Sequence, residues 1–151
     1  MNNKKHALTV KFATILVSLL FLYASIAKMI EYSTFKLEIQ ENPLLAPSEN
    51  IVAITLISLE LLSVLLLNVP KYRSVGLYTA IILLVSFTVY IINIEFTQKG
   101  IPCACGGIIE SLSRKQHILF NVVFIAITGI GIHSQSKLTP HKKTKSSAMM
   151  V

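Results

Sequence analysis

Four long apolar stretches constrain the fold of this chain more than any other feature. They cover residues 12–30, 51–69, 75–94 and 118–132. About 20 mostly apolar residues cross a bilayer as a helix, because the hydrocarbon layer is roughly 30 Å thick and each residue rises about 1.5 Å. The stretches lack the period-two alternation of membrane strands. We therefore predict an all-α fold, an integral membrane bundle of four transmembrane helices.

The composition agrees with a membrane protein. Of the 151 residues 53% are hydrophobic and only 14% are charged, and the mean hydropathy is +0.66. The fourth stretch is the shortest, since its apolar residues would cover only about 22 Å as a helix. The helical turn before it, residues 113–117, should then lie in the interface or against protein. We expect residues 1–135 to form the membrane domain and residues 136–151 a polar, disordered cytoplasmic tail.

The distribution of Lys and Arg predicts the orientation, because cytoplasmic segments carry an excess of both. Nine lie in the N-terminus, the second connection and the C-terminal tail, and four lie in the first and third connections. This predicts an inner-membrane protein with both termini cytoplasmic and the third connection outside, in the periplasm if the host is a bacterium. The net charge of +7 is mostly this topology signal, so we expect membrane lipid as a partner and no nucleic acid.

A cleaved signal peptide is the alternative interpretation of the first stretch. It has a basic start and an apolar centre, and Ser25-Ile26-Ala27 would be the cleavage site. The apolar part, residues 12–27, is longer than the usual signal core of about 7 to 15 residues. Cleavage would leave the third connection outside in either case.

The only two cysteines, Cys103 and Cys105, stand one residue apart in the third connection, within Ile101-Pro102-Cys103-Ala104-Cys105-Gly106-Gly107. An oxidising exterior is where disulfides form and persist. A static brace is one interpretation, but a ring of three residues would stabilise the fold by only about 1.6 kcal/mol before strain is subtracted. Strain instead favours a redox-active pair, since it makes a disulfide easier to reduce. Pro102 and Gly106 are typical of a tight turn that exposes both sulfurs.

A metal site is the third interpretation of the cysteine pair. His117 or Glu110 would have to complete the ligands, because two thiolates are only half of a tetrahedral zinc set and no second Cys pair exists. We therefore favour the redox pair and expect no metal.

Polar residues inside or beside the apolar stretches form the second group of candidates. Glu60 lies near the middle of the second stretch, where an isolated carboxylate costs several kcal/mol, and Lys28 near the outer end of the first is its obvious partner. Counting places Glu60 about 13 Å below the start of its helix. Contact therefore requires Lys28 to reach inward or the spans to be offset. The alternative is a protonated Glu60 hydrogen-bonded to Ser or Thr.

Two segments near the outer surface are also candidates. His117 and Asn121 are one helical turn apart and share a face, where they would position a proton or a partner or form an interfacial cap. Tyr32, Phe35 and Ile39 have the spacing of a short helix on the outer surface, which Pro43 and Pro47 would end. Such a helix would be a lid, a docking surface or a plain interfacial connector.

The order of these motifs carries a resemblance to a known family. The motifs are Tyr23-Ala24-Ser25-Ile26-Ala27-Lys28, Phe35, Pro43-Leu44-Leu45, Glu60, Pro102-Cys103-Ala104-Cys105-Gly106, His117 and Asn121. Over roughly residues 10–133 the chain resembles the MauE-type methylamine utilisation proteins, which are grouped with DoxX-like redox-associated membrane proteins. The resemblance implies a four-span inner-membrane protein needed for producing methylamine dehydrogenase, a disulfide-rich periplasmic enzyme, through disulfide formation or delivery of redox equivalents.

Three functions are compatible with these residues. In the first, Cys103 and Cys105 exchange disulfides with a periplasmic thioredoxin-like or disulfide-containing client. Two cysteines cannot pass a disulfide between internal pairs, so a quinone or a second protein must complete the electron transfer, and no ring-binding pocket is evident for a quinone. In the second, the chain is a non-catalytic scaffold or maturation factor. In the third, Lys28 and Glu60 serve a proton- or ion-coupled transporter.

Overall fold

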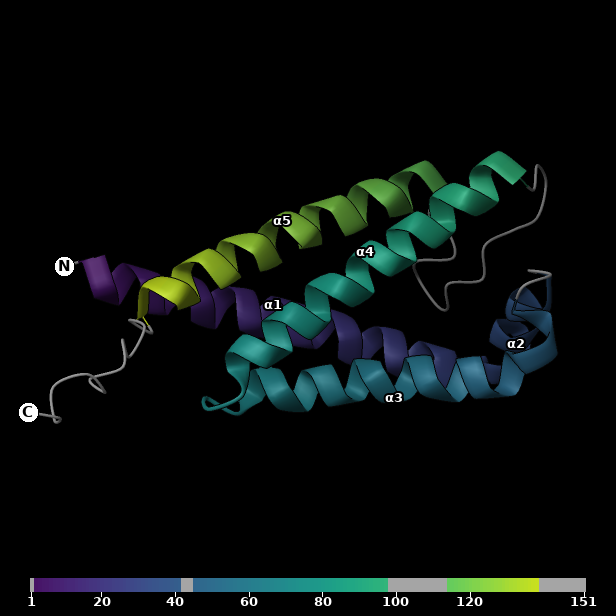
Figure 1. Ribbon diagram of the computed structural model, residues 1–151, viewed down its shortest axis with the longest axis horizontal. Coiled ribbons are helices and arrows are strands. Elements are labelled where there is room, and N and C mark those ends of the chain that lie inside the picture. The colour runs from purple at the N-terminus through teal and green to yellow at the C-terminus, as the bar shows by residue number, and fades with distance from the viewer. Residues whose placement is uncertain (1, 42–44, 98–113, 139–151) are drawn as a thin grey trace, which may run out of the picture.

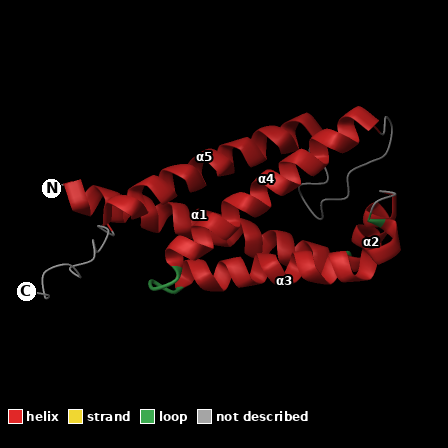
Figure 2. Cartoon of the chain, viewed as in Figure 1, coloured by secondary structure: helices red, strands yellow, loops and turns green. Residues whose placement is uncertain are grey.

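The protein is a bundle of long helices (Figure 1). The computed structural model describes residues 2–41, 45–97 and 114–138. The elements are α1 (Asn2–Ile30), α2 (Tyr32–Glu41), the short 3-10 helix η1 (Ala46–Ser48), α3 (Glu49–Asn68), α4 (Arg73–Thr97) and α5 (Arg114–Leu138). Only helices and loops occur in these described ranges (Figure 2). Cys103 and Cys105 lie outside them, as do Pro43 and most of the predicted tail.

Four helical segments are long and apolar enough to cross a membrane. They are Asn3–Ile30, Ala46–Asn68, Arg73–Asn93 and Gln116–Leu138. The predicted all-α membrane bundle of four transmembrane helices is thereby confirmed. The fourth segment is longer than its apolar run, since its 23 residues cover about 34 Å. Polar residues extend it at both ends. At the C-terminal end, Ser134 is buried and the Ser136 hydroxyl donates to the His133 carbonyl.

The four long helices are arranged as a ring of neighbours. The α1 helix packs against α3 and α5, and α4 packs against the same two helices. Successive long helices run in opposite directions, so the start of α1, the end of α5 and the α3–α4 turn share one end of the bundle (Figure 1). The end of α4, the start of α5 and the short helix α2 share the other end, which we call the α2 end. This alternation is expected of consecutive membrane-spanning helices, since each span starts on the side where the previous one ended.

Apolar packing occurs in two clusters. The larger joins α1, α3 and α4 through Val17, Phe21, Leu67, Leu77, Ala80, Leu83 and Leu84. The smaller joins α2 to α3 through Phe35, Ile39, Ala53 and Ile57. The spacing of Tyr32, Phe35 and Ile39 therefore corresponds to a real helix, but Phe35 and Ile39 are covered by α3. Leu37, on the other face of α2, is 60% exposed.

Close backbone approach explains one glycine. A Cβ atom on Gly76 would lie 2.7 Å from the Leu67 nitrogen and 2.9 Å from the Leu66 carbonyl carbon. Any other amino acid at position 76 would force the backbone to shift, so glycine is what lets the first turn of α4 approach the end of α3 so closely. This contact fixes the tight turn between the second and third spans.

Candidate functional site

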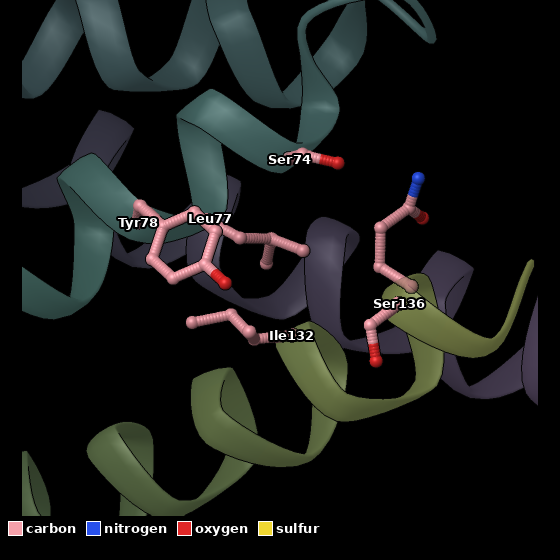
Figure 3. Close-up of a pocket in the computed structure, with 6 residues that line it drawn as sticks. Ser74, Leu77, Tyr78, Ile132 and Ser136 are labelled. Atoms are coloured by element: carbon pink, nitrogen blue, oxygen red, sulfur yellow. The ribbon is translucent and has the colours of Figure 1, made fainter. Parts of the chain in front are cut away.

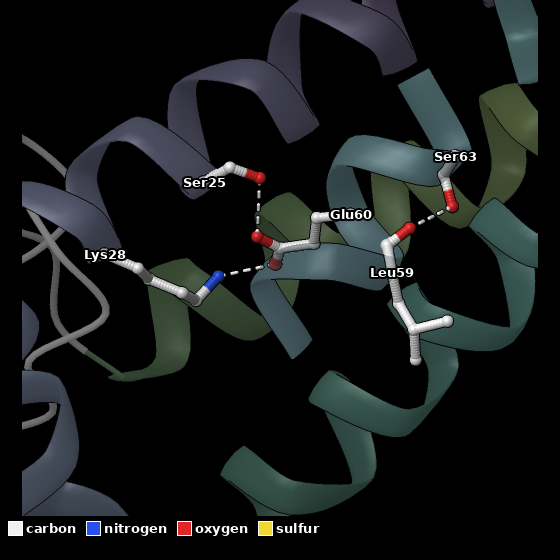
Figure 4. Close-up of polar contacts among 5 residues, drawn as sticks. All are labelled: Ser25, Lys28, Leu59, Glu60 and Ser63. Carbon is white, nitrogen blue, oxygen red and sulfur yellow. Dashed lines mark hydrogen bonds and ion pairs between the residues drawn. The ribbon is translucent and has the colours of Figure 1, made fainter. Parts of the chain in front are cut away.

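A buried ion pair between α1 and α3 is the centre of the candidate site (Figure 4). The Lys28 Nζ atom lies 2.5 Å from Glu60 Oε1, and the two side chains are 8% and 1% exposed. The Ser25 hydroxyl, one turn before Lys28, donates to Glu60 Oε2 at 3.0 Å. Both carboxylate oxygens of Glu60 therefore accept a hydrogen bond from α1. A charge this deep in a membrane bundle is tolerated only when paired in this way.

Two aromatic rings complete the surroundings of Lys28. Its Nζ lies 4.8 Å from the centre of the Phe87 ring on α4 and 5.7 Å from that of Phe35 on α2. Both distances are within the range of cation–π attraction, which strengthens when the cation is desolvated. One ammonium group on α1 thus contacts α2, α3 and α4. We call Ser25, Lys28, Phe35, Glu60 and Phe87 the ion-pair cluster.

An offset between α1 and α3 brings the pair together. Lys28 stands two residues before the end of α1, whereas Glu60 stands eleven residues after the start of α3. The α3 helix therefore extends about 16 Å beyond Glu60 on the α2 end, while α1 ends close to Lys28. The α2 helix packs on the part of α3 that extends beyond the end of α1. Its Phe35 packs on α3 and faces Lys28. The sequence allowed two arrangements, a Lys28 side chain that reaches inward or offset spans, and the structure has offset spans.

The predicted direct contact between Lys28 and Glu60 is present in the structure. The Ser25 hydroxyl also donates to Glu60, so a serine hydrogen bond accompanies the ion pair and does not replace it. The same Ser25 is part of the potential cleavage motif, where it is fully buried in the continuous helix α1. Its contact with Glu60 was not predicted, although the three-residue spacing from Lys28 places both on one face.

His117 and Asn121 lie in the first two turns of α5, at the α2 end. Asn121 is buried at 5% exposure and His117 is half-buried. In the described part of the chain, neither forms a hydrogen bond or an ion pair with Lys28 or Glu60. The structure therefore places them on a neighbouring helix near the same end without joining them to the ion-pair cluster.

The cysteine pair falls within residues 98–113, outside the described ranges. The helix ends on either side, the last turn of α4 and the first turn of α5, are both at the α2 end (Figure 1). Within the residues that the structure describes, no group of three or more His, Cys, Asp or Glu side chains gathers in a way that would hold a metal ion.

Four membrane-spanning helices around a buried ion pair define a multi-pass membrane protein. A family model described as methylamine utilisation protein MauE matches residues 5–134, which include the second and third spans and most of the first and fourth. The chain belongs to the MauE family, as the order of its motifs predicted. No curated protein and no solved structure matches the chain. The grouping with DoxX-like proteins stays a prediction.

Proposed function

We propose that this MauE-family protein is a membrane-anchored component of thiol–disulfide exchange outside the inner membrane. A client thiolate attacks the Cys103–Cys105 disulfide, and the mixed disulfide is resolved by the second client thiol. The client gains a disulfide and gives two electrons and two protons to the cysteine pair. A second redox partner, a quinone or another protein, must reoxidise the pair. The client is a periplasmic thioredoxin-like or disulfide-containing protein, and the family description suggests methylamine utilisation as the context.

The placement of the helix ends is the observation that carries the proposal. The cysteine segment connects two helix ends at the α2 end. The opposite end contains six Lys and Arg residues, Lys4, Lys5, Lys11, Lys71, Arg73 and Lys137, whereas the α2 end has Lys36 in α2 and Arg114 and Lys115 at the start of α5. Cytoplasmic ends are the ones enriched in Lys and Arg, so this asymmetry supports cytoplasmic termini and an exterior cysteine segment. Disulfide chemistry persists on that side of a bacterial inner membrane.

The ion-pair cluster has a supporting role in this proposal. Both charges are satisfied inside the bundle, and the cluster links α1, α2, α3 and α4 beneath the α2 end. It holds α4, one of the two helices that flank the cysteine segment, against α1. His117 and Asn121 follow that segment directly on α5 and help to orient the client there. A transporter would instead require Glu60 to exchange its proton, and Glu60→Gln would then abolish activity while the cysteine variants did not.

Replacement of the cysteines tests the proposal. In Cys103→Ser/Cys105→Ser cells, we expect client disulfides to fail to form while the variant still inserts in the membrane at normal levels. Ala104→Ser is the matched control, since it adds the same hydroxyl to the same tripeptide without removing a thiol. Full client oxidation by the double variant would leave the non-catalytic scaffold as the function.

A further inference from the structure

A small recess lies at the end of the bundle opposite α2, between the first turns of α4 and the last turns of α5 (Figure 3). It is lined by Ser74, Leu77, Tyr78, Ile132, Gln135 and Ser136, and its volume is about 80 Å³. Pockets for whole cofactors or drug-sized ligands have volumes of about 300 Å³ or more. The recess therefore has room for a group of a few heavy atoms.

Hydroxyl groups dominate the polar lining of this recess. In the described part of the chain, the hydroxyls of Ser74 and Tyr78 have no hydrogen-bond partner. The Ser136 hydroxyl donates to the His133 carbonyl at 2.8 Å, which leaves its oxygen at the rim. Leu77 is fully buried and separates the recess from the core of the bundle. Among the described residues, the Ser74 and Tyr78 hydroxyls are thus available as hydrogen-bond donors beside the apolar side chains of the recess.

The charge around the recess is entirely positive among the described residues. Arg73 precedes Ser74, and Lys137 follows Ser136 and is exposed. The Arg73 Nε atom donates to the Leu67 carbonyl at the end of α3, at a distance of 3.4 Å. The acidic residues that the structure describes lie between α1 and α2, in α2, in α3 as far as Glu60, and in the last turn of α4. Hydroxyl donors within a positive field favour an anion.

We infer that the recess binds the phosphate of an anionic phospholipid headgroup. The lining residues belong to the terminal turns of two membrane spans, Arg73–Asn93 and Gln116–Leu138, which is the depth of lipid headgroups. Tyr78 is 55% exposed and Val75 54%, so the recess borders a face that acyl chains can cover. Basic pockets between spanning helices on the cytoplasmic side recognise lipid headgroups in this way. Ser74 and Tyr78 donate to the phosphate, and Lys137 supplies the charge.

Lipid retention by the full chain tests this inference. Protein purified in detergent is mixed with phosphatidylglycerol or phosphatidylcholine, and the lipids retained are counted by native mass spectrometry. We expect one phosphatidylglycerol to be retained in preference to phosphatidylcholine. Ser74→Ala/Tyr78→Phe removes only the two hydroxyls and should weaken phosphatidylglycerol binding by about tenfold. Lys137→Gln should also weaken it and should reduce its dependence on salt.

Thr79→Val is the matched control, because the Thr79 hydroxyl on the same helix donates to the Val75 carbonyl and does not line the recess. Its lipid binding should equal that of the unchanged chain. Equal retention of the two lipids, or unchanged retention by the double variant, would overturn the inference. Competition by inorganic phosphate at millimolar concentration, with no preference for the lipid, would show a free-phosphate site and would also overturn it.

Discussion

At the scale of single residues, the Lys28 ammonium on α1 contacts side chains of three other helices. It pairs with Glu60 and faces the rings of Phe35 and Phe87. A buried ion pair is weak evidence for net stability, because desolvation offsets most of the attraction between the charges. Removal of one partner is costly, since the other charge is then left unpaired. The pair therefore specifies how α1 and α3 align more than it stabilises them.

Single and double replacements separate these two effects. Lys28→Met or Glu60→Met alone should lower the free energy of unfolding by about 3 kcal/mol or more, because each leaves a lone buried charge. The double variant Lys28→Met/Glu60→Met should recover most of that loss. Unfolding of the purified protein in detergent, followed by circular dichroism, measures both.

The Lys36–Glu49 pair provides the matched comparison. Its atoms are 3.8 Å apart and its side chains are 29% and 19% exposed. Replacing Lys36 by Met should cost less than about 1 kcal/mol, as for other pairs that water reaches. Equal losses at Lys28 and Lys36 would contradict the importance of burial for the Lys28–Glu60 pair.

Ser25 gives a second prediction at this scale. Ser25→Ala removes a hydrogen bond to a buried carboxylate and should destabilise the protein by about 2 kcal/mol. Ser63 is equally buried, but its hydroxyl donates at 2.8 Å to the Leu59 carbonyl of its own helix. Ser63→Ala should therefore change stability little. Thermal unfolding of the two variants side by side measures the difference, and a larger loss at Ser63 would refute this account of Ser25.

Sequence reasoning identified the charged members of the cluster and placed Phe35 on a short surface helix, but it did not predict that aromatic rings face Lys28. Lys28 and Glu60 stand out because charges are rare in apolar stretches. Phe87 resembles other aromatic residues in such stretches, and nothing local indicates that its ring or that of Phe35 faces Lys28. The depth of Glu60 relative to Lys28 also depends on how far α1 and α3 are offset, which residue counting cannot supply.

At the scale of elements, α2 and the helix ends determine the shape of the site. The spacing in residues 32–39 predicted α2. The offset between α1 and α3, which leaves α2 room to pack on α3, arises from tertiary packing. The fourth span was predicted to be short because only its apolar run was counted. Polar residues continue α5 at both ends, since a helix satisfies its own backbone wherever water or protein surrounds the side chains.

The α3–α4 turn gives the prediction at this scale. Gly76→Ala should destabilise the bundle by about 1 to 3 kcal/mol, because the new Cβ would overlap the backbone of Leu66 and Leu67. Gly129→Ala is the control on α5, where no heavy atom lies within 4 Å of the added methyl. It should be neutral or stabilising by up to about 1 kcal/mol. Equal stability of the two variants in detergent would contradict the close approach at Gly76.

At the scale of the whole molecule, the two ends of the bundle differ in charge and content. One end has the start of α1, the end of α5, most of the described cations and the recess between α4 and α5. The other has α2 and the helix ends that flank the cysteine segment, with the ion-pair cluster beneath them. The four spans could be predicted from hydropathy, and the orientation that Lys and Arg indicate stays a prediction. The ring order of the helices could not, because lipid-facing and buried apolar residues look alike in a sequence.

The central claim is that the cysteine pair cycles between a disulfide and two thiols outside the membrane. Labelling of intact cells with a membrane-impermeant maleimide tests it directly, since the chain has only two cysteines and any label reports this pair. A variant that lacks both cysteines and has a single Ser146→Cys substitution is the control, since the proposed orientation puts the C-terminal tail in the cytoplasm, and it should react only after permeabilisation. We predict strong labelling of Cys103 and Cys105 after mild reductant and weak labelling without it. Labelling that required permeabilised cells, or that was equally strong without reductant, would contradict the claim.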